Sequence, residues 1–456
     1  MPNKKTTDFT TGSIPRHLIT FAIPMFLGNV LQALYNIVDS IWVGRFLGHQ
    51  AFAAISVSFP VIFVLIALVM GITMGTTTLV GQYYGAKKND MVSKTISNSM
   101  FLLIICGGLV SLLGIFFSRQ ILLFINVPAD ILEMASSYLK IFSSGLLGMF
   151  LYNGTSAILR GLGDSRTPLK FLFYATFFNL LLDPFLIFGL GPFPRLETNG
   201  AALATVIAQA ISALISLRYL FFTSRLVDFK KNFWIWDLSI IKLIFKIGLP
   251  AGLQHVFISL SSLVVSSLVN RFGSTIVAGF GAGATIDQFA FMPAMSLGMA
   301  VSSLVAQNLG AGQNERVQES VYWSSLLTTS ITLIASLAAM FIPHLLLFPF
   351  TTDPDVIAAG SRYLYYLSFA YIPMALMFTL GGVLRGAGDT FVAMLFTLIS
   401  LWLIRVPLAS YLSSLPALGI EGVWMGIAAS PLIGLLLNYL YYRSGRWKKS
   451  LIKETN

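Results

Sequence analysis

The sequence predicts an all-α integral membrane protein with twelve transmembrane helices, arranged as two parallel lobes of six helices each. The first observation behind this prediction is composition: 56% of the 456 residues are hydrophobic and 10% are charged, with a mean hydropathy of +0.80. Soluble domains carry roughly 25% charged residues. The second observation is a succession of long apolar runs, and the third is an internal repeat.

The apolar runs are each long enough to cross a bilayer core of roughly 30 Å. We expect spans at 15–43, 51–81, 96–117, 132–159, 167–190, 200–222, 240–271, 277–308, 319–349, 356–384, 391–411 and 420–442. The first run is too long for the apolar region of a signal peptide, so we expect it to remain as the first helix. The single cysteine, Cys106, excludes an intrachain disulfide.

Basic residues follow the pattern of a membrane protein rather than that of a nucleic-acid-binding protein. If the N-terminus is cytoplasmic, 22 of the 29 Lys and Arg residues fall in cytoplasmic ends and loops. This is the positive-inside pattern. It predicts a multi-pass protein of the cell (inner or plasma) membrane with both termini in the cytoplasm. We therefore attribute the net charge of +11 to this asymmetry, and we expect membrane lipid and no nucleic acid among the partners.

The chain repeats itself at a nearly constant spacing. LRGLGD at 159–164 returns as LRGAGD at 384–389, and GQYYGA at 81–86 returns as AQNLGA at 306–311, both at the same offset. Pro24 and Pro250 repeat at almost the same offset. The repeat predicts lobes at 1–222 and 240–456, the second with a basic cytoplasmic tail, joined by a cytoplasmic linker at 223–239. Six helices per lobe place both lobes in the same orientation, and alternating access needs two lobes that rock against each other.

Two aspartates stand in otherwise apolar spans, Asp39 in the first and Asp183 in the fifth. A carboxylate at membrane depth costs about 2.5–3.5 kcal/mol or more unless it is protonated, paired or hydrated, so such residues suggest ion or proton sites. At about 1.5 Å per helical residue, both lie roughly 7–8 Å below the outer edge, and Thr205 of the sixth span lies at the same depth. The alternative is that both aspartates satisfy backbone or hydroxyl groups where helices pack.

Polar neighbours strengthen the prediction of a site. Asn179 precedes Asp183 by one turn, and Pro184 directly after it lacks a backbone N–H, which loosens that turn. On the first helix, three polar side chains share the face of Asp39, namely Gln32, Tyr35 and Asn36. Amides also bond between packed helices, which is the alternative interpretation for Gln32, Asn36 and Asn153.

Taken together, the doubled LRGxGD and GQxxGA-like motifs, the aspartate in helix one and FNLLLDP followed by GAALAT resemble the multidrug and toxic compound extrusion (MATE) family, DinF-like branch. The resemblance spans essentially the whole chain. It implies a MATE-type fold and cation-driven export of cationic or amphipathic drug-like molecules. By matching motifs it implies a cation site of Asp39, Asn179, Asp183, Thr205 and the Ala201 carbonyl, with Gln32, Tyr35 and Asn153 lining the cavity.

The coupling ion is open between H⁺ and Na⁺. Two buried carboxylates raise each other's proton affinity, which suits H⁺. Oxygen atoms of Asp39, Asn179, Asp183 and Thr205 would equally suit Na⁺. We favour H⁺, because the branch that the chain resembles includes proton-coupled members, and we expect no cofactor. At the matching positions of the second lobe stand Val265 and Val406, so we expect coupling to be confined to the first lobe.

Three further residues have alternative interpretations. Asp287 either binds cationic substrate or pairs with a basic partner such as Arg405. Met292, followed by Met295 and Met299 at helical spacing, either forms an adaptable drug surface or packs in a core. Pro24, fifteen residues before Asp39, is expected to kink the first helix; the family resemblance links such a bend to protonation.

Rival functions are less well supported by the residues. A lipid-linked oligosaccharide flippase of the same superfamily is the nearest alternative, but such flippases usually have a more cationic cavity. The loop of major-facilitator transporters is absent; GQYYGAKKND stands there. No HExxH or GxSxG motif indicates an enzyme. A passive channel is a further alternative function. We therefore expect a monomeric secondary transporter of small organic substrates.

Overall fold

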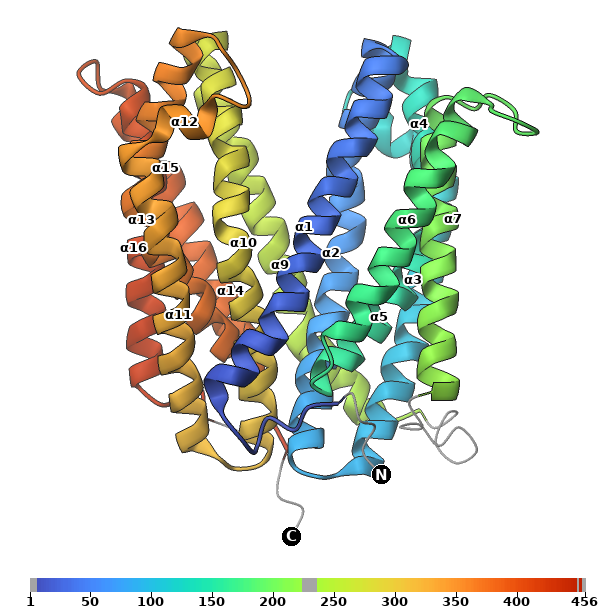
Figure 1. Cartoon of the computed structure of the whole chain (residues 1–456), viewed down its shortest axis with the longest axis vertical. Helices are drawn as coiled ribbons and strands as arrows, with labels where there is room; N and C mark the ends of the chain where they lie inside the picture. Colours follow the sequence, from blue (N-terminus) through green and yellow to red (C-terminus); the bar gives the residue numbers. More distant parts are fainter. Residues whose placement is uncertain (1–5, 224–235, 449–450, 453–456) are drawn as a thin grey trace. The chain divides into compact units, whose positions relative to one another are not determined.

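The computed structural model describes residues 6–223, 236–448 and 451–452 (Figure 1). These residues are almost wholly helical, and no β-strand occurs among them. Most of the predicted linker at 223–239 and part of the basic C-terminal tail lie outside the described residues.

The first half of the chain contains α1 (Ile14–Phe46), α2 (His49–Gly85), α3 (Asn89–Phe124), α4 (Ala129–Ser144), α5 (Leu146–Gly161), α6 (Arg166–Phe188) and α7 (Thr198–Arg218), which continues into the π-helical turn η1 (Tyr219–Thr223). The second half contains α9 (Leu238–Val269), the 3₁₀ turn η2 (Asn270–Phe272), α10 (Ser274–Gly310), α11 (Asn314–Phe341), α12 (Pro343–Leu347), α13 (Pro354–Ala387), α14 (Thr390–Leu398), the π-helical η3 (Ile399–Arg405), α15 (Val406–Ser414) and α16 (Ile420–Arg443).

The prediction of twelve membrane spans is confirmed. Among the described residues, eleven helices are long and apolar enough to cross a membrane, and the twelfth span is a pair of helices. In that pair α4 and α5 meet at a 44° bend around Gly145, where the sequence predicts one span at 132–159. The predicted span at 391–411 is also composite, because α14, η3 and α15 follow one another without a loop.

Large apolar side chains are exposed along the outer faces of the spans. Phe124 is 87% exposed, Ile334 71% and Phe116 69%, although a soluble protein would bury residues of this kind. Several spans contain an internal proline, including Pro60, Pro184 and Pro293. Membrane helices tolerate such prolines because neighbouring groups satisfy the carbonyl that each proline leaves without a donor.

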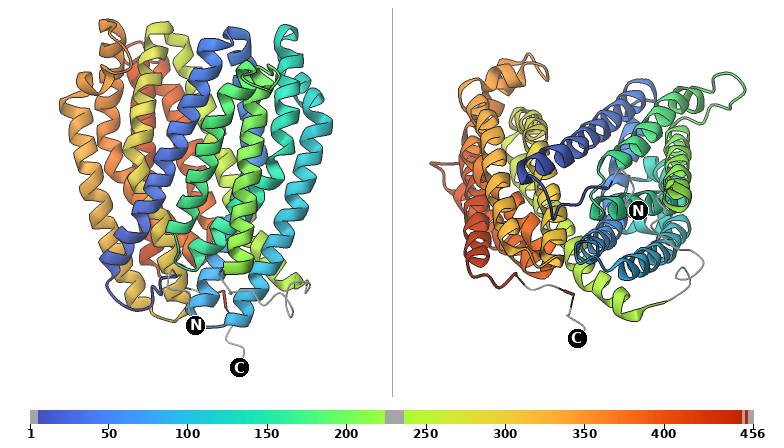
Figure 2. Two further views of the ribbon diagram at one scale, coloured as in Figure 1. Left: turned by 45° about the vertical axis from the view of Figure 1, so that its right-hand side comes forward. Right: turned by 60° about the horizontal axis from the view of Figure 1, so that its bottom comes forward.

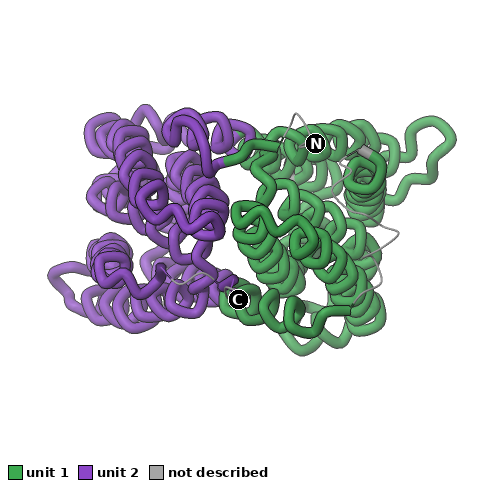
Figure 3. Tube along the Cα trace, turned by 90° about the horizontal axis from the view of Figure 1, so that it is seen from below, with its two compact units in different colours: residues 1–8, 27–252 green, residues 9–26, 253–456 purple. Residues whose placement is uncertain are grey.

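The chain forms two compact units, coloured separately in Figure 3: unit 1 comprises residues 1–8 and 27–252, and unit 2 comprises residues 9–26 and 253–456. Two helices pass from one unit to the other, α1 after Phe26 and α9 after Gly252. Pro24 and Pro250 each stand two residues before these crossing points, so the crossings repeat at the same spacing as the prolines. Pro24 is buried within a helix that continues through it.

Each unit has its own apolar core. In unit 1 the core joins α2, α3, α4, α6 and α7, with Ala54, Leu122, Leu139, Ile187 and Ala202 among its members. Helices α6 and α7 of this unit lie side by side (Figure 2). In unit 2 one cluster surrounds Tyr371 and Trp424, and another buries Phe9 and Leu18 against α10 and α13.

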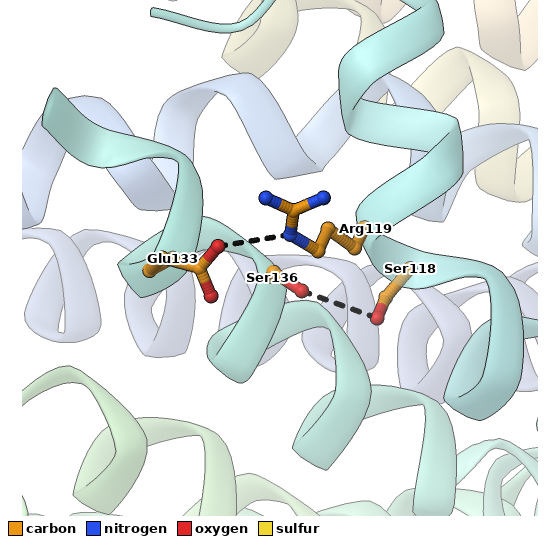
Figure 4. Close-up of polar contacts among 4 residues, drawn as sticks. All are labelled: Ser118, Arg119, Glu133 and Ser136. Atoms are coloured by element: carbon orange, nitrogen blue, oxygen red, sulfur yellow. Dashed lines mark hydrogen bonds and ion pairs between the residues drawn. The ribbon is translucent and has the colours of Figure 1, made fainter. Parts of the chain in front are cut away.

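Polar contacts hold α4 beside α3 near the ends where the two helices meet (Figure 4). The buried hydroxyls of Ser118 and Ser136 are 3.4 Å apart, and Arg119 Nε lies 2.9 Å from Glu133 Oε1. The Arg119 and Glu133 side chains are 55% and 75% exposed, so this ion pair contributes at most about 1 kcal/mol. The position of α4 matters because it carries Tyr138, which faces the candidate site.

The LRGLGD motif builds the junction between α5 and α6. Gly163 has φ +82°, a left-handed conformation that favours glycine, and ends the turn after α5. Asp164 then accepts from the backbone N–H groups of Arg166 and Thr167 at 3.0 Å each, and from the Thr167 hydroxyl at 2.5 Å. The motif therefore has a structural explanation: it terminates one span and caps the start of the next.

Candidate functional site

The candidate site in unit 1 begins with the second half of α1. Tyr35 and Asp39 are one helical turn apart on the same face, both partly buried, and the Tyr35 hydroxyl lies close to the Asp39 carboxyl. Gln32 and Asn36 differ from them, because both are exposed and bond to each other, Gln32 Nε2 donating to Asn36 Oδ1 at 3.5 Å. Of the predicted residues on α1, the structure brings Tyr35 and Asp39 into the cluster.

Helix α6 supplies the most deeply buried members of the cluster. Asn179 and Asp183 are one turn apart and have 1% and 0% exposure. When the Asn179 amide is oriented so that donors face acceptors, its nitrogen donates to Asp183 Oδ2 at 3.0 Å and its oxygen accepts from the backbone N–H of Thr205 at 3.3 Å. Asn179 therefore connects the carboxyl group on α6 to the backbone of α7. Pro184 stands directly after Asp183, in a helix that continues to Phe188.

Helix α7 closes the cluster from a third direction. The hydroxyl groups of Thr205 and Tyr35 are 2.9 Å apart, and buried Ala201 lies one turn before Thr205. A glycine allows this helix to approach α6, because a Cβ at Gly200 would stand 2.4 Å from the Leu186 carbonyl oxygen. Tyr35 of α1 and Asn179 of α6 thus both lie next to Thr205 of α7.

The carboxyl groups of Asp39 and Asp183 lie within hydrogen-bonding reach of each other. On each of them the Oδ1 atom is buried and has no hydrogen-bond partner among the described residues. Two ionised carboxylates cannot share such a site without strong repulsion. A proton between them, or a monovalent cation held by their oxygens, removes that repulsion and satisfies the orphan atoms. The residues present therefore fit either coupling ion.

Tyr138 is a member of the site that sequence reasoning missed. It lies on α4, is 6% exposed, and is close enough to both Asp39 and Asp183 to interact with them electrostatically. A signal was present in the repeat: SSYL at 136–139 returns as SRYL at 361–364, at the same offset as the LRGxGD motifs. Asn153, by contrast, is partly buried on α5 and donates to the Met149 carbonyl of its own helix at 2.9 Å.

Asp287 lies in unit 2, on α10, and is 8% exposed. Tyr363 donates to its Oδ2 at 2.5 Å and Tyr371 donates to its Oδ1. The alternative of a direct ion pair with Arg405 is not observed between these two described side chains; Arg405 Nε donates instead to Ser430 Oγ at 2.9 Å. The tyrosines occupy both carboxylate oxygens, since α13 packs along α10.

Met292 follows Asp287 on α10 and is 5% exposed, whereas Met295 is 43% exposed. The buried position of Met292 is that of a packed side chain, and the carbonyl of the same residue accepts a bond from Ser296 at 2.8 Å. The structure therefore brings together Asp39, Asn179, Asp183 and Thr205, with Tyr35 and Ala201, and places Asp287 and Met292 in the other unit.

Twelve membrane spans and a buried acidic pair, in which each carboxyl group has one oxygen without a partner among the described residues, are features of a membrane transport protein. The model of the MatE family matches the chain twice, at residues 24–185 and 250–411. The second match begins and ends at the spacing of the internal repeat from the first, since it starts at Pro250 where the first starts at Pro24. The chain belongs to the MatE (MATE) family of transporters.

Individual relatives match over nearly the whole chain. The probable multidrug resistance protein YpnP of Bacillus subtilis (strain 168) is 34% identical, with 97% of this chain and 98% of that protein covered. An FAD transporter of Shewanella oneidensis is 28% identical, with 94% of each chain covered. A solved structure of a multidrug resistance MATE family transporter in an outward-facing conformation has a TM-score of 0.90 at 22% identity, covering 97% of this chain and 98% of that one.

Proposed function

We propose that this protein is an antiporter of the cell membrane that exports cationic or amphipathic organic compounds in exchange for H⁺ bound at the Asp39–Asp183 pair. The observation that carries the proposal is the acidic pair itself. It comprises two buried carboxyl groups within reach of each other, each with one oxygen that lacks a partner among the described residues. Such a pair needs a positive charge from outside the protein.

The ligands that each ion needs support H⁺ over Na⁺. The two carboxyl groups alone can share a proton, because they lie within hydrogen-bonding reach of each other. Sodium would need further oxygen ligands, and the Tyr35 and Thr205 hydroxyls are already in contact with each other.

The exchange follows from the electrostatics of the pair. When the pair is protonated, it loses its negative charge and no longer attracts a cationic substrate. When the protons leave, the carboxylates can bind the cation. Alternation between two lobes, with the same pair exposed to each side in turn, then couples inward proton movement to outward substrate movement. In this proposal the protein works as a monomer with both termini in the cytoplasm.

Proteoliposomes provide the decisive experiment. The purified protein is reconstituted, and uptake of a fluorescent organic cation is measured under an imposed pH gradient and then under an imposed Na⁺ gradient, with protein-free liposomes as the control. We expect uptake under the pH gradient alone. Uptake under the Na⁺ gradient alone would replace H⁺ by Na⁺, and uptake that equilibrates without any gradient would indicate a passive channel.

The substrate class requires a separate comparison. A flippase for lipid-linked oligosaccharides is the alternative function, and the acidic pair of unit 1 disfavours it because such cargo carries phosphate. The FAD transporter among the relatives makes FAD an appropriate anionic competitor in the same vesicles. We expect organic cations to compete with the fluorescent cation and FAD not to compete. Stronger competition by FAD would overturn the proposed substrate class.

A further inference from the structure

Unit 1 has a groove between α1 and α6 that the proposed transport cycle does not use. Its volume is about 480 Å³, which is within the range of sites for small ligands. Two of the residues that line it belong to α1 and four belong to α6, so the groove lies entirely within unit 1. The lining residues are Leu27, Leu31, Leu169, Lys170, Phe173 and Tyr174.

Most of the groove wall is apolar and accessible. The Leu27 side chain is 48% exposed and the Phe173 side chain is 57% exposed. The two helices contact each other beside the groove, because a Cβ at Gly28 would stand 3.7 Å from Leu172 Cδ2 and 3.8 Å from Leu169 Cδ1, which is ordinary van der Waals contact. Both helices are long and apolar enough to span a membrane, so lipid chains can cover this wall.

One edge of the groove is cationic. Arg166, Lys170 and Tyr174 follow one another at intervals of four residues, so they share one face of α6, and all three are exposed. Neither of the two cations forms an ion pair among the described residues. The carboxyl group of Asp164, which precedes them in the chain, is buried and accepts from the first N–H groups of α6. The positive charges of this edge are therefore available to an anion.

The cationic and apolar parts follow one another along α6 in the order that a phospholipid requires. At about 1.5 Å per residue, Lys170 stands roughly 6 Å from the start of α6 and Phe173 roughly 10 Å from it. The start of α6 is the end that we expect to face the cytoplasm. A phosphate at the membrane interface would meet the cations there, while an acyl chain follows the apolar wall. An organic cation would instead place its charge beside Lys170, which repels it.

The groove lies close to the acidic site along both helices. On α1, Leu31 precedes Tyr35 by one helical turn on the same face, and Asp39 follows one turn later. On α6, the helix that forms the other wall continues to Asp183. A ligand in the groove therefore packs against the two helices that carry the acidic pair.

We propose that the groove between α1 and α6 binds one anionic phospholipid, with its phosphate at Arg166 and Lys170 and an acyl chain among Leu27, Leu31 and Phe173. The bound lipid packs α1 against α6 and thereby supports the geometry of the acidic pair. This supporting role rests on the proposed function, whereas the binding site itself does not.

Native mass spectrometry of the purified protein tests the headgroup contact. The protein in detergent is mixed with phosphatidylglycerol or with phosphatidylcholine of the same acyl chains, and lipid retention is compared. We expect wild-type protein to retain phosphatidylglycerol at least about fivefold better, and Lys170→Gln to lose about fivefold of that retention. Lys242→Gln is the matched control, because Lys242 is exposed and is the fifth residue of α9, as Lys170 is of α6. Equal retention of the two lipids, or unchanged retention in Lys170→Gln, would overturn the proposal.

A second pair of variants tests the seat of the acyl chain without changing charge. Leu27→Trp fills the groove at an exposed position and should lower phosphatidylglycerol retention by about fivefold. Leu34→Trp, at a leucine of α1 that is 50% exposed and does not line the groove, should retain the lipid as wild type does. Equal retention in the two variants would contradict the chain position. Displacement of the lipid by dodecyltrimethylammonium would make the groove a site for organic cations and would also overturn the proposal.

Transport separates the supporting role from the proposed function. Uptake under the same pH gradient is compared in phosphatidylcholine vesicles with and without phosphatidylglycerol. We expect the anionic lipid to raise the initial rate at least about twofold in wild type and in Lys242→Gln, and not in Lys170→Gln. Equal rates in both kinds of vesicle would overturn the supporting role. Wild-type protein that responds to no gradient would contradict the proposed function, while lipid retention would still test the binding site.

Discussion

The carboxyl groups of Asp39 on α1 and Asp183 on α6 lie within hydrogen-bonding reach of each other inside unit 1, and each keeps one buried oxygen without a partner among the described residues. In the proposed function this pair binds the coupling proton. Because a shared proton removes the repulsion between two carboxylates, its release changes the forces between the helices that carry them.

Asp39→Asn and Asp183→Asn should each abolish pH-driven efflux while the protein still folds. An amide has nearly the shape of a carboxyl group but cannot release or bind a proton in this range, and neutralisation removes the repulsion within the pair. We expect a loss of at least about 100-fold in initial rate, measured in proteoliposomes. Glu133→Gln, at an exposed position on α4, is the control and should be unchanged. Coupled efflux in either aspartate variant would show that the pair does not carry the ion.

Tyr35→Phe and Thr205→Val should have similar, modest effects, because each removes one side of the same hydroxyl contact at 2.9 Å. A hydrogen bond of this kind contributes about 0.5–1.5 kcal/mol, which corresponds to roughly 2- to 10-fold in transport efficiency. The double variant should be no worse than the poorer single variant. Tyr322→Phe, at a 63% exposed tyrosine of α11, provides the comparison. If the effects of the two substitutions on transport efficiency multiply in the double variant, the two hydroxyls act independently.

Gly200→Ala should destabilise unit 1, because the new Cβ would stand 2.4 Å from the Leu186 carbonyl oxygen where α6 and α7 meet. Overpacking of this kind costs about 1–3 kcal/mol, visible as a lower unfolding midpoint in detergent. Gly108→Ala on α3 is the matched control, since a Cβ there meets no atom within 4 Å. Equal midpoints for the two variants would show that the contact between α6 and α7 adapts without cost.

Asp164→Ala should lower stability without touching the acidic pair. The substitution removes the acceptor for two backbone N–H groups at the start of α6, a loss of about 1 kcal/mol for a helix cap. Asp164→Asn retains an acceptor and should recover most of the midpoint. Wild-type stability in the alanine variant would mean that water replaces the cap. A change in the preference between H⁺ and Na⁺ gradients would argue against a purely structural role for the motif.

Four polar residues of unit 1 could be predicted as one site from the sequence, namely Asp39, Asp183, Asn179 and Thr205. Polar groups within apolar spans stand out, and the rise per helical residue puts them at similar depth. Tyr138 could not be recognised from its own span, since a tyrosine in a membrane helix is unremarkable until its neighbours are known. For Asp287 the sequence left open a cationic substrate or a basic partner, and the observed partners are two tyrosines of α13.

By itself, the sequence determined the membrane class, the number of spans, the repeat and the two acidic positions on α1 and α6. These features depend on composition and on local helical spacing, which a linear pattern records. The tertiary structure alone decided which carboxyl oxygens lack a partner, how Tyr35 meets Thr205 and which tyrosines bond to Asp287. Those outcomes depend on the rotation and close approach of helices far apart in the chain, through small residues such as Gly200, and no spacing along one helix encodes them.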